Sequence, residues 1–224
     1  MSTLRIVCLS DTHNLHAGLV VPEGDLLIHS GDFTGQGTPK EIEAFGDWLA
    51  TQPHEHKVVV AGNHDFLFER DRPRAEALLG EVHYLQDQGL ELLGLRLWGS
   101  PWTPEFHDWA FNLPRGQALA DKWALIPEDT DLLITHGPPM GLLDRTCRGL
   151  VVGCEDLREA AARVRPALHV FGHIHEEYGV LEHDSMLLVN ACNCSFRYKL
   201  VNAPTVIDWE IGVGPRAVSV NGEH

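Results

Sequence analysis

The sequence "VFGHIHEEYG", residues 170–179, is an apolar run that leads into a glycine and two histidines, His173 and His175. Short apolar runs that end in Asp, Asn or His occur at four more places: "LRIVCLSD" (4–11), "DLLIHSGD" (25–32), "KVVVAGNHD" (57–65) and "DLLITHG" (131–137). Runs of this length and composition are typical of strands buried on both faces. They predict five strands, each followed by side chains that can bind a ligand.

Helical segments separate these predicted strands. Three of them are 38–50, 72–80 and 154–166. The first begins with a capping box formed by Thr38 and Glu41, with proline at the first helical position. Residues 178–191 alternate like a hairpin, and 205–211 resemble one more strand. Strands that alternate with helices predict an α/β fold with right-handed crossovers.

The length of the chain, 224 residues, and its 44% hydrophobic content favour one globular domain, 1–224, with a core at about 4–211. Within it, about 90–123 is expected to be an insert with one or two strands, an aromatic-rich loop and a short helix. Four aromatic residues of this segment either form an exposed anchor for a partner or, as we prefer, pack on the sheet and wall a cleft: Trp102, Phe106, Trp109 and Phe111.

Charge and cysteine content limit the partners and the compartment. A formal charge of −15 repels phosphate backbones, so duplex nucleic acid is not expected as an obligate partner. No basic leader begins the chain and no apolar run approaches the roughly 20 residues that cross a bilayer, so we expect a cytoplasmic protein without a membrane partner. Five cysteines are too few for a disulfide scaffold, and "NACNCS" (190–195) lacks a second pair for structural zinc. The oligomeric state is left open.

The residues that follow the predicted strands form a set of nitrogen and oxygen ligands. They are Asp11, His13, Asp32, Asn63, His136, His173 and His175. Because ligands of α/β sheets bind beyond the carboxyl ends of strands, these side chains are expected to converge. Imidazole, carboxylate and amide groups together suit first-row divalent ions. Each motif alone has an ordinary interpretation as a turn or cap, but five in one order favour a metal site.

Seven ligands exceed what one ion needs, so we expect two divalent transition-metal ions, manganese first, with iron, nickel, cobalt or zinc as alternatives. Two dications about 3.5–4 Å apart repel each other, and a bridging carboxylate, best supplied by Asp32, offsets this repulsion. The glycines of "SGD", "AGNH", "THG" and "FGH" are expected to permit sharp turns. An extended backbone would direct His173 and His175 to opposite sides, one toward each ion.

Other polar residues have less specific interpretations. His29 and His169 are expected to be packed and hydrogen-bonded, whereas His54 and His56 are expected to be solvated. Three arginines are candidate phosphate clamps, although each is by default a surface residue: Arg145, Arg148 and Arg197.

The order D-x-H, GD, GNH, H-G and GHxH resembles that of the calcineurin-like metallophosphoesterase superfamily. Longer phrases are similar to its metallophosphoesterase-domain-containing branch: "AGNHD", "GSPWTPEF", "FNLPRGQAL", "ITHGPP" and "HVFGHIHEEYG". The resemblance covers about residues 4–211. It implies a four-layer α-β-β-α sandwich with mixed sheets and a two-metal site at the loop edge.

The resemblance also implies a role for each residue. One ion would be held by Asp11, His13, Asp32 and His175, and the other by Asp32, Asn63, His136 and His173. His64 would contact the phosphate or the leaving group. Separately from the resemblance, we expect the adjacent Asp65 to orient His64. The segment "GDFTGQG" (31–37) departs from the D-x-x-D-R-G continuation of protein serine/threonine phosphatases, which counts against a phosphoprotein substrate.

These features favour a phosphodiesterase that uses a hydroxide activated by two metal ions to cleave small substrates, with cyclic nucleotides among those to be screened. A phosphomonoesterase or a nucleotide pyrophosphatase with the same centre is an alternative. A scaffold that binds metal without catalysis is the alternative outside the enzymes, but none of the expected ligands is missing.

Overall fold

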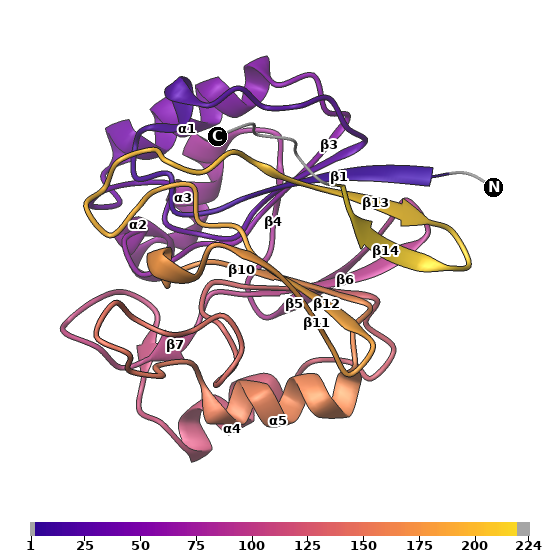
Figure 1. Ribbon diagram of the computed structural model, residues 1–224. Coiled ribbons are helices and arrows are strands. Elements are labelled where there is room, and N and C mark those ends of the chain that lie inside the picture. Colours follow the sequence, from indigo (N-terminus) through magenta and orange to yellow (C-terminus); the bar gives the residue numbers. More distant parts are fainter. Residues whose placement is uncertain (1–2, 219–224) are drawn as a thin grey trace.

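Two six-stranded sheets face each other, and helices cover the outer face of each, in a computed structural model that describes residues 3–218. Figure 1 shows the layers in the order helices, sheet, sheet, helices. The predicted four-layer α-β-β-α sandwich with mixed sheets is therefore confirmed.

The first sheet has the strand order β14-β13-β1-β2-β3-β4. Its strands are β1 (Thr3–Leu9), β2 (Leu26–His29), β3 (His56–Val59), β4 (His83–Tyr84), β13 (Thr205–Glu210) and β14 (Gly214–Ala217). The four strands β1 to β4 run parallel, whereas β13 and β14 add antiparallel neighbours to one side.

The second sheet has the order β11-β12-β10-β9-β6-β5. Its strands are β5 (Gln88–Leu92), β6 (Leu95–Ser100), β9 (Leu132–Thr135), β10 (Leu168–Phe171), β11 (Gly179–His183) and β12 (Met186–Asn190). Its four inner strands are parallel, and each edge strand pairs with its neighbour as an antiparallel hairpin. The predicted hairpin at 178–191 is the β11–β12 pair.

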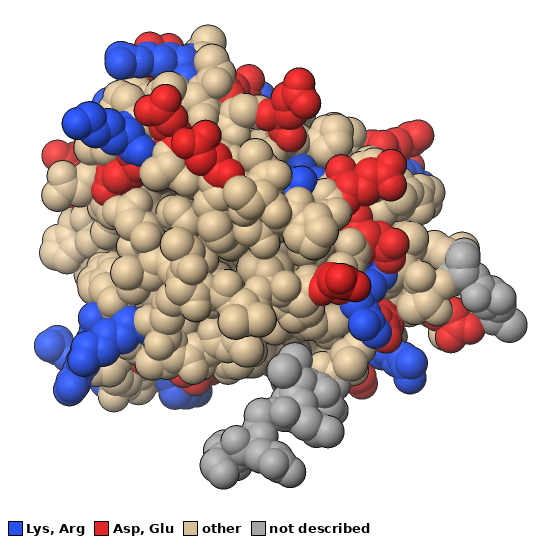
Figure 2. Space-filling view, turned by 90° about the horizontal axis from the view of Figure 1, so that it is seen from above, with Lys and Arg blue, Asp and Glu red and all other residues tan. Residues whose placement is uncertain are grey.

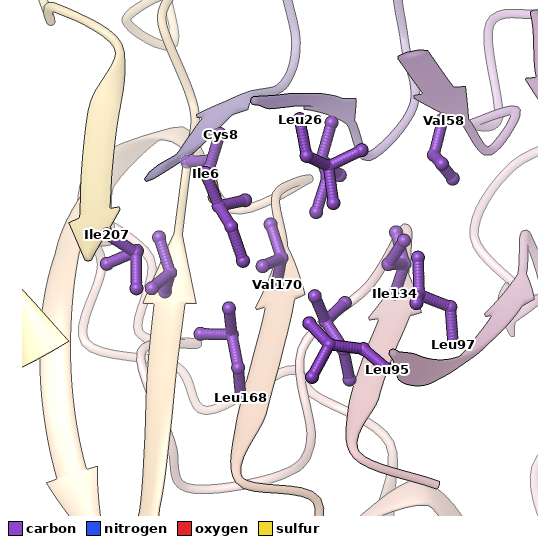
Figure 3. Close-up of a cluster of buried hydrophobic side chains, with 14 of the residues drawn as sticks. Ile6, Cys8, Leu26, Val58, Leu95, Leu97, Ile134, Leu168, Val170 and Ile207 are labelled. Carbon is purple, nitrogen blue, oxygen red and sulfur yellow. The ribbon is translucent and has the colours of Figure 1, made fainter. Parts of the chain in front are cut away.

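The alternation of side chains along the strands explains the four layers. In β1, Ile6 and Cys8 enter the core between the sheets, while Val7 and Leu9 face the helices. Figure 3 shows the first set meeting side chains of the second sheet, such as Leu168. Because both faces of the inner strands are buried, these strands are mostly apolar, as their sequences indicated.

Three helices cover the first sheet and two cover the second. They are α1 (Pro39–Thr51), α2 (Phe66–Arg70) and α3 (Arg72–Leu79), then α4 (Gln117–Trp123) and α5 (Glu155–Val164). Two short 3₁₀ turns are η1 (His16–Gly18) and η2 (His175–Glu177). The capping box predicted for α1 is present: Thr38 accepts a hydrogen bond from the Glu41 amide, and the Glu41 carboxylate accepts one from the Thr38 amide.

The segment 90–123 contains the strands, the aromatic-rich loop and the short helix that its sequence suggested, but most of it is part of the sandwich and not an insert. Its first strands, β5 and β6, belong to the second sheet, where β6 pairs in parallel with β9 and Leu95 and Leu97 enter the core. Its helix, α4, covers the same sheet. Only the loop between them lies outside the sandwich, and it carries the short pair β7 (Thr103–Pro104) and β8 (Asn112–Leu113).

The surface carries dispersed charge. On the face seen from above Figure 1, acidic and basic side chains surround an uncharged centre, and no continuous basic band crosses it (Figure 2). Among residues 3–218, every helix is too short or too polar to cross a membrane.

Candidate metal centre

The carboxyl ends of β1, β2, β3, β9 and β10 meet at one edge of the sandwich, and the loops that follow them bring the predicted ligands together. Of these ligands, the first four come from the first sheet and the last three from the second: Asp11, His13, Asp32, Asn63, His136, His173 and His175. Five are buried, and the two final histidines are partly exposed to the cavity described below.

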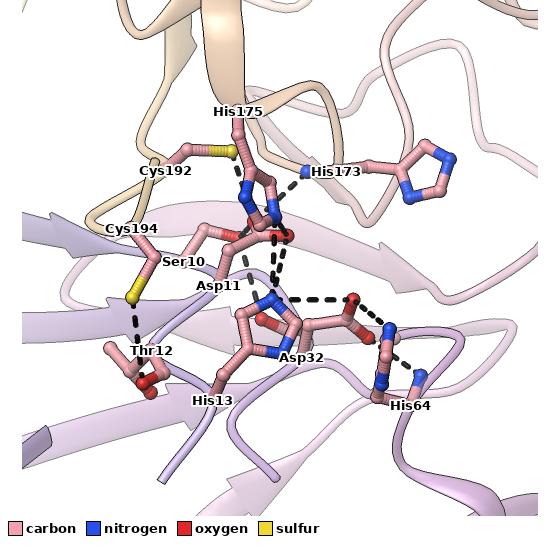
Figure 4. A network of polar contacts seen from close by, with 12 residues as sticks. Ser10, Asp11, Thr12, His13, Asp32, His64, His173, His175, Cys192 and Cys194 are labelled. Carbon is pink, nitrogen blue, oxygen red and sulfur yellow. Dashed lines mark hydrogen bonds and ion pairs between the residues drawn. The ribbon is translucent and has the colours of Figure 1, made fainter. Parts of the chain in front are cut away.

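One part of the cluster surrounds the Asp11 carboxylate. Its Oδ1 lies 3.1 Å from His175 Nε2 and 3.9 Å from His13 Nε2. The two imidazole nitrogens are themselves 3.3 Å apart. Figure 4 shows the two rings facing each other beside Asp11, with the His173 ring directed elsewhere.

The other part surrounds His136. Its Nε2 lies 2.8 Å from Asn63 Oδ1 and 3.4 Å from Asp32 Oδ2. His173 belongs to the same part of the cluster. Asp32, His136 and His173 each offer one ligand atom, and these three atoms lie within 4.8 Å of one another.

Asp32 belongs to both parts. Its Oδ2 is 3.4 Å from His136 Nε2 and 3.9 Å from His13 Nε2, and its Oδ1 accepts a hydrogen bond from the His64 amide at 2.8 Å. A carboxylate oxygen between two groups of imidazoles is what a bridging ligand requires.

The outer nitrogens of these histidines determine which tautomer can be present. Nδ1 of His136 faces the Ser30 carbonyl oxygen at 3.0 Å, and Nδ1 of His175 faces that of Ser195 at 2.9 Å. A carbonyl oxygen only accepts, so each Nδ1 carries the hydrogen and each Nε2 directs a lone pair into the cluster. In the cluster, the oxygen atoms next to His136 Nε2 are Asn63 Oδ1 and Asp32 Oδ2. A lone pair that faces two oxygen acceptors is unfavourable unless a cation or a second proton lies between them. The cluster therefore fits divalent ions.

Electrostatics in the cluster agree with this interpretation. Burial raises the pKa of Asp32, but the charge of His136, its hydrogen bond and the charges of the neighbouring histidines together outweigh burial and hold that pKa below its ordinary value. Burial lowers the pKa of His136, but the carboxylate of Asp32 outweighs this and raises it to about 9. Burial lowers the pKa of His173 to about 4, so His173 is neutral at pH 7 and can act as a ligand.

Four of the seven predicted ligands have left-handed backbone, which is rare outside glycine. They are Asp11 (φ 52°), His13 (φ 41°), Asp32 (φ 55°) and His173 (φ 68°). Backbone strain of this kind costs on the order of 1–3 kcal/mol per residue and persists mostly at functional sites. The expectation that glycines make the sharp turns is therefore only partly right, because ligand residues themselves adopt strained conformations.

The glycines of these motifs mainly allow close approach between ligands. A Cβ on Gly62 would overlap the carboxylate of Asp32, and one on Gly172 would overlap that of Asp11. A larger residue at either position would displace a ligand carboxylate.

The expectation of an extended backbone at His173 and His175 is wrong, although the two rings do join different groups. His173 is left-handed, and His175 begins the 3₁₀ turn η2. The His173 amide donates to Asp11 Oδ2 at 2.9 Å, which ties this turn to the loop after β1.

His64 lies at the edge of the cluster. Its Nε2 is 4.0 Å from Asp32 Oδ2, and its Nδ1 donates to the Gly35 carbonyl oxygen at 2.8 Å. Geometry alone also groups His64 with His13 and Asp32 as atoms that could surround an ion. The Trp109 ring packs on the outer side, with 5.1 Å between the ring centroids.

Asp65 does not orient His64 as expected. Its buried carboxylate accepts hydrogen bonds from the amides of Asp32 at 2.9 Å, Thr34 at 3.0 Å and Gly62 at 2.8 Å. The Gly35 carbonyl takes the expected role, and Asp65 instead joins the loops after β2 and β3.

Cys192 also approaches the cluster, although its motif did not indicate a metal site. Its buried Sγ lies 3.1 Å from Asp11 Oδ2 and forms a possible ligand group with Asp11 and His175. The signal available in the sequence was its place two residues after the end of β12, at the same edge as the other ligands.

A cavity of about 550 Å³ opens beside the cluster. Asp32, Asn63 and His64 form part of its lining, and so do Trp109 and Arg148. The lining further includes Phe106, Arg115, Phe196 and Tyr198. Of the three candidate phosphate clamps, Arg148 alone borders this cavity, whereas Arg145 donates to the Gly149 carbonyl oxygen and Arg197 lies over Phe196.

Sequence reasoning missed Arg115 and Tyr198, because neither lies next to a ligand motif. The aromatic residues of the loop after β6 lie in two different environments. Phe111 is buried and Trp102 is half-buried, whereas Phe106 and Trp109 line the cavity. The interpretation of this loop as a cleft wall, packed in part on the sheet, agrees with the geometry.

Two further histidines, His29 and His169, are packed within strands. His29 contacts Thr12 Oγ1 at 3.0 Å and His169 contacts Thr135 Oγ1 at 2.8 Å, as expected of packed strand residues. The expectation that His54 is solvated is wrong: its side chain is buried, while His56 is partly exposed.

Comparisons with known proteins agree with this geometry. A family model described as calcineurin-like phosphoesterase matches residues 4–177. Metallophosphoesterase domain-containing protein 1 of Homo sapiens and that of Mus musculus are each 46% identical to this chain over 229 residues, which covers 91% of this chain and 70% of each relative.

Solved structures show the same fold. Phosphopantetheinyl hydrolase from Mycobacterium tuberculosis matches with a TM-score of 0.58 at 15% identity, covering 98% of this chain and 97% of that one. The protein TT1561 of Thermus thermophilus matches with a TM-score of 0.57 at 16% identity, covering 84% of this chain and 89% of that one. The motif order, the cluster geometry and the match to the family model lead to one conclusion: the chain belongs to the calcineurin-like phosphoesterase family.

Proposed function

We propose that the protein is a metal-dependent phosphodiesterase that hydrolyses small phosphodiesters in the cavity beside the cluster. Family membership supports phosphoester hydrolysis with divalent metal ions. The observation that carries the proposal is the Asp32 carboxylate, shared between two groups of imidazoles at the base of a cavity of about 550 Å³.

In this proposal, Asp11, His13 and His175 hold one ion, Asn63, His136 and His173 hold the other, and Asp32 contacts both. Manganese is the proposed metal, because the mixture of imidazole and oxygen ligands suits first-row ions. When bound, two such ions supply positive charge for the phosphate oxygens and a water that ionises near neutral pH. Cys192 stays a hydrogen-bond donor to Asp11, since burial raises the pKa of its thiol.

His64 acts on the leaving group in this proposal. Because its Nδ1 hydrogen is committed to the Gly35 carbonyl oxygen, only Nε2 is free to face substrate. To donate a proton from Nε2, the ring must be protonated at both nitrogens.

The charge of the cavity favours diesters over monoesters. Arg115 and Arg148 are the basic side chains in its lining, and Arg115 is already paired with Glu155. A diester carries one negative charge where a monoester carries close to two, so a cavity with few cations beyond the two proposed metal ions suits a diester better. The net charge of −15 also supports small substrates over duplex nucleic acid.

Replacing the shared carboxylate tests the proposal. We expect D32A to lose bound manganese, measured by mass spectrometry of metals, and to lose hydrolysis of bis(p-nitrophenyl) phosphate. The control is D184A, which removes an exposed carboxylate in the β11–β12 turn and should retain both.

Three outcomes would contradict the proposal. Hydrolysis that persists in D32A would exclude the shared carboxylate from catalysis. Faster turnover of p-nitrophenyl phosphate than of the diester by the wild-type protein would favour a phosphomonoesterase, and no turnover of either ester with bound manganese would favour a scaffold.

A further inference from the structure

The exposed aromatic side chains of this protein gather at one place. Within residues 3–218, three phenylalanine, tyrosine or tryptophan side chains are largely exposed: Phe106 (56%), Phe196 (53%) and Tyr198 (48%). All three line the cavity beside the metal-ligand cluster. Exposed aromatic surface is unfavourable in water, so its concentration at the mouth of one cavity points to contact with a ligand.

Tyr198 lies closest to the reacting centre. Its ring centroid is 4.7 Å from that of His13 in an edge-on arrangement, 5.7 Å from that of His175 and 6.1 Å from that of His64. The ring thus borders three imidazoles of the site while about half of its surface stays open to the cavity. A substituent attached to a phosphorus atom at the cluster would meet this open surface.

The backbone holds Tyr198 in place at a cost. Its φ of 54° is left-handed, which is unusual for an aromatic residue. The Tyr198 amide donates to the Ser195 carbonyl oxygen at 2.8 Å, and the Ser195 amide donates to the Lys199 carbonyl oxygen at 2.9 Å, which closes a tight turn at 195–199. The same Ser195 oxygen accepts from His175 Nδ1 at 2.9 Å. The turn that carries Tyr198 is therefore anchored directly to a proposed metal ligand.

We propose that Tyr198 is a specificity-determining residue that packs against a planar ring attached next to the phosphorus of the substrate. This inference rests on the proposed function, because it assumes that the phosphorus binds at the cluster. Aromatic pairs contribute about 0.5–1.5 kcal/mol beyond the burial of their area, which corresponds to a preference of roughly two- to tenfold.

Binding of two phosphonates to the manganese-loaded protein tests this assignment without any turnover. Phenylphosphonate and methylphosphonate present the same anionic group on a phosphorus–carbon bond, and they differ in the ring. In titration calorimetry, we expect the wild-type protein to bind phenylphosphonate about five- to tenfold more tightly. Y198L should bring the two affinities to within about twofold of each other, and Y198F, which keeps the ring, should retain most of the preference.

Two controls separate recognition from damage to the metal site. V201A changes an exposed residue near the turn that does not line the cavity, and it should behave as wild type. Manganese bound per chain, counted by electron paramagnetic resonance, should be the same in Y198L and in wild type.

Three results would overturn the assignment: equal affinities of the wild-type protein for both phosphonates, an unchanged preference in Y198L, or an equal loss of both affinities in Y198L. The last result would mean that Tyr198 supports the ligand cluster and does not recognise a ring. If the preference behaves as expected but the wild-type protein hydrolyses no diester, the proposed function fails while the role of Tyr198 in binding stands.

Discussion

At the scale of single residues, the site depends on which nitrogen of each histidine carries hydrogen. Carbonyl oxygens of Ser30, Ser195 and Gly35 fix Nδ1–H on His136, His175 and His64. Two of these rings then direct Nε2 toward the carboxylates of the cluster. The third, His64, has its Nε2 4.0 Å from Asp32 Oδ2 and borders the cavity, and in our proposal it acts on the substrate and does not hold a metal ion.

This separation predicts the behaviour of H64A. We expect the variant to keep its manganese and to lose kcat by about a hundredfold or more, as the removal of a general acid does. The loss should be smaller for a diester with a good leaving group, p-nitrophenolate, than for the matched phenyl ester, because a good leaving group needs no proton. Steady-state kinetics on both esters check this, and an equal loss on the two would contradict a role in leaving-group protonation.

At the scale of elements, the loops after β2 and β3 form one unit because Asp65 joins them. Three amide groups and the Thr34 hydroxyl converge on its buried carboxylate. The loop after β2 carries Asp32, and the loop after β3 carries Asn63 and His64. The position of Asp32 relative to Asn63 and His64 therefore depends on Asp65. In our proposal, Asp65 itself contacts neither substrate nor metal.

We expect D65A to lower the free energy of unfolding by about 3 kcal/mol or more, because it leaves several buried amides without an acceptor. Urea denaturation of the metal-free protein measures this change without a contribution from bound ions. The control D71A removes the exposed cap of α3 and should cost about 1 kcal/mol. A D65A variant as stable as D71A would show that the carboxylate is not needed to join the loops.

At the scale of the whole molecule, the cluster joins the two sheets. Asp11, His13, Asp32 and Asn63 follow strands of the first sheet, whereas His136, His173 and His175 follow strands of the second. In the proposal, ions bound here would stabilise the packing of one sheet on the other, in addition to the apolar core between them (Figure 3).

Manganese should accordingly raise the melting temperature of the protein. A ligand at one hundred times its dissociation constant stabilises the folded state by about 2.7 kcal/mol. Differential scanning calorimetry with manganese and with a chelator measures the difference. The same experiment on D32A should show a much smaller difference, and an equal difference in both proteins would place the stabilising ions elsewhere.

The sequence by itself determined the five strands that precede the ligands, the capped helix α1 and the seven residues that converge, because periodicity and capping are local and parallel strands carry their following loops to one edge. Only the tertiary structure decided the rest. The assignment of β5 and β6 to the second sheet, the junction made by Asp65, the burial of His54 and the place of Tyr198 over His13 depend on contacts between segments far apart in the chain. Local sequence patterns do not encode such contacts, since packing selects them only when the two sheets come together.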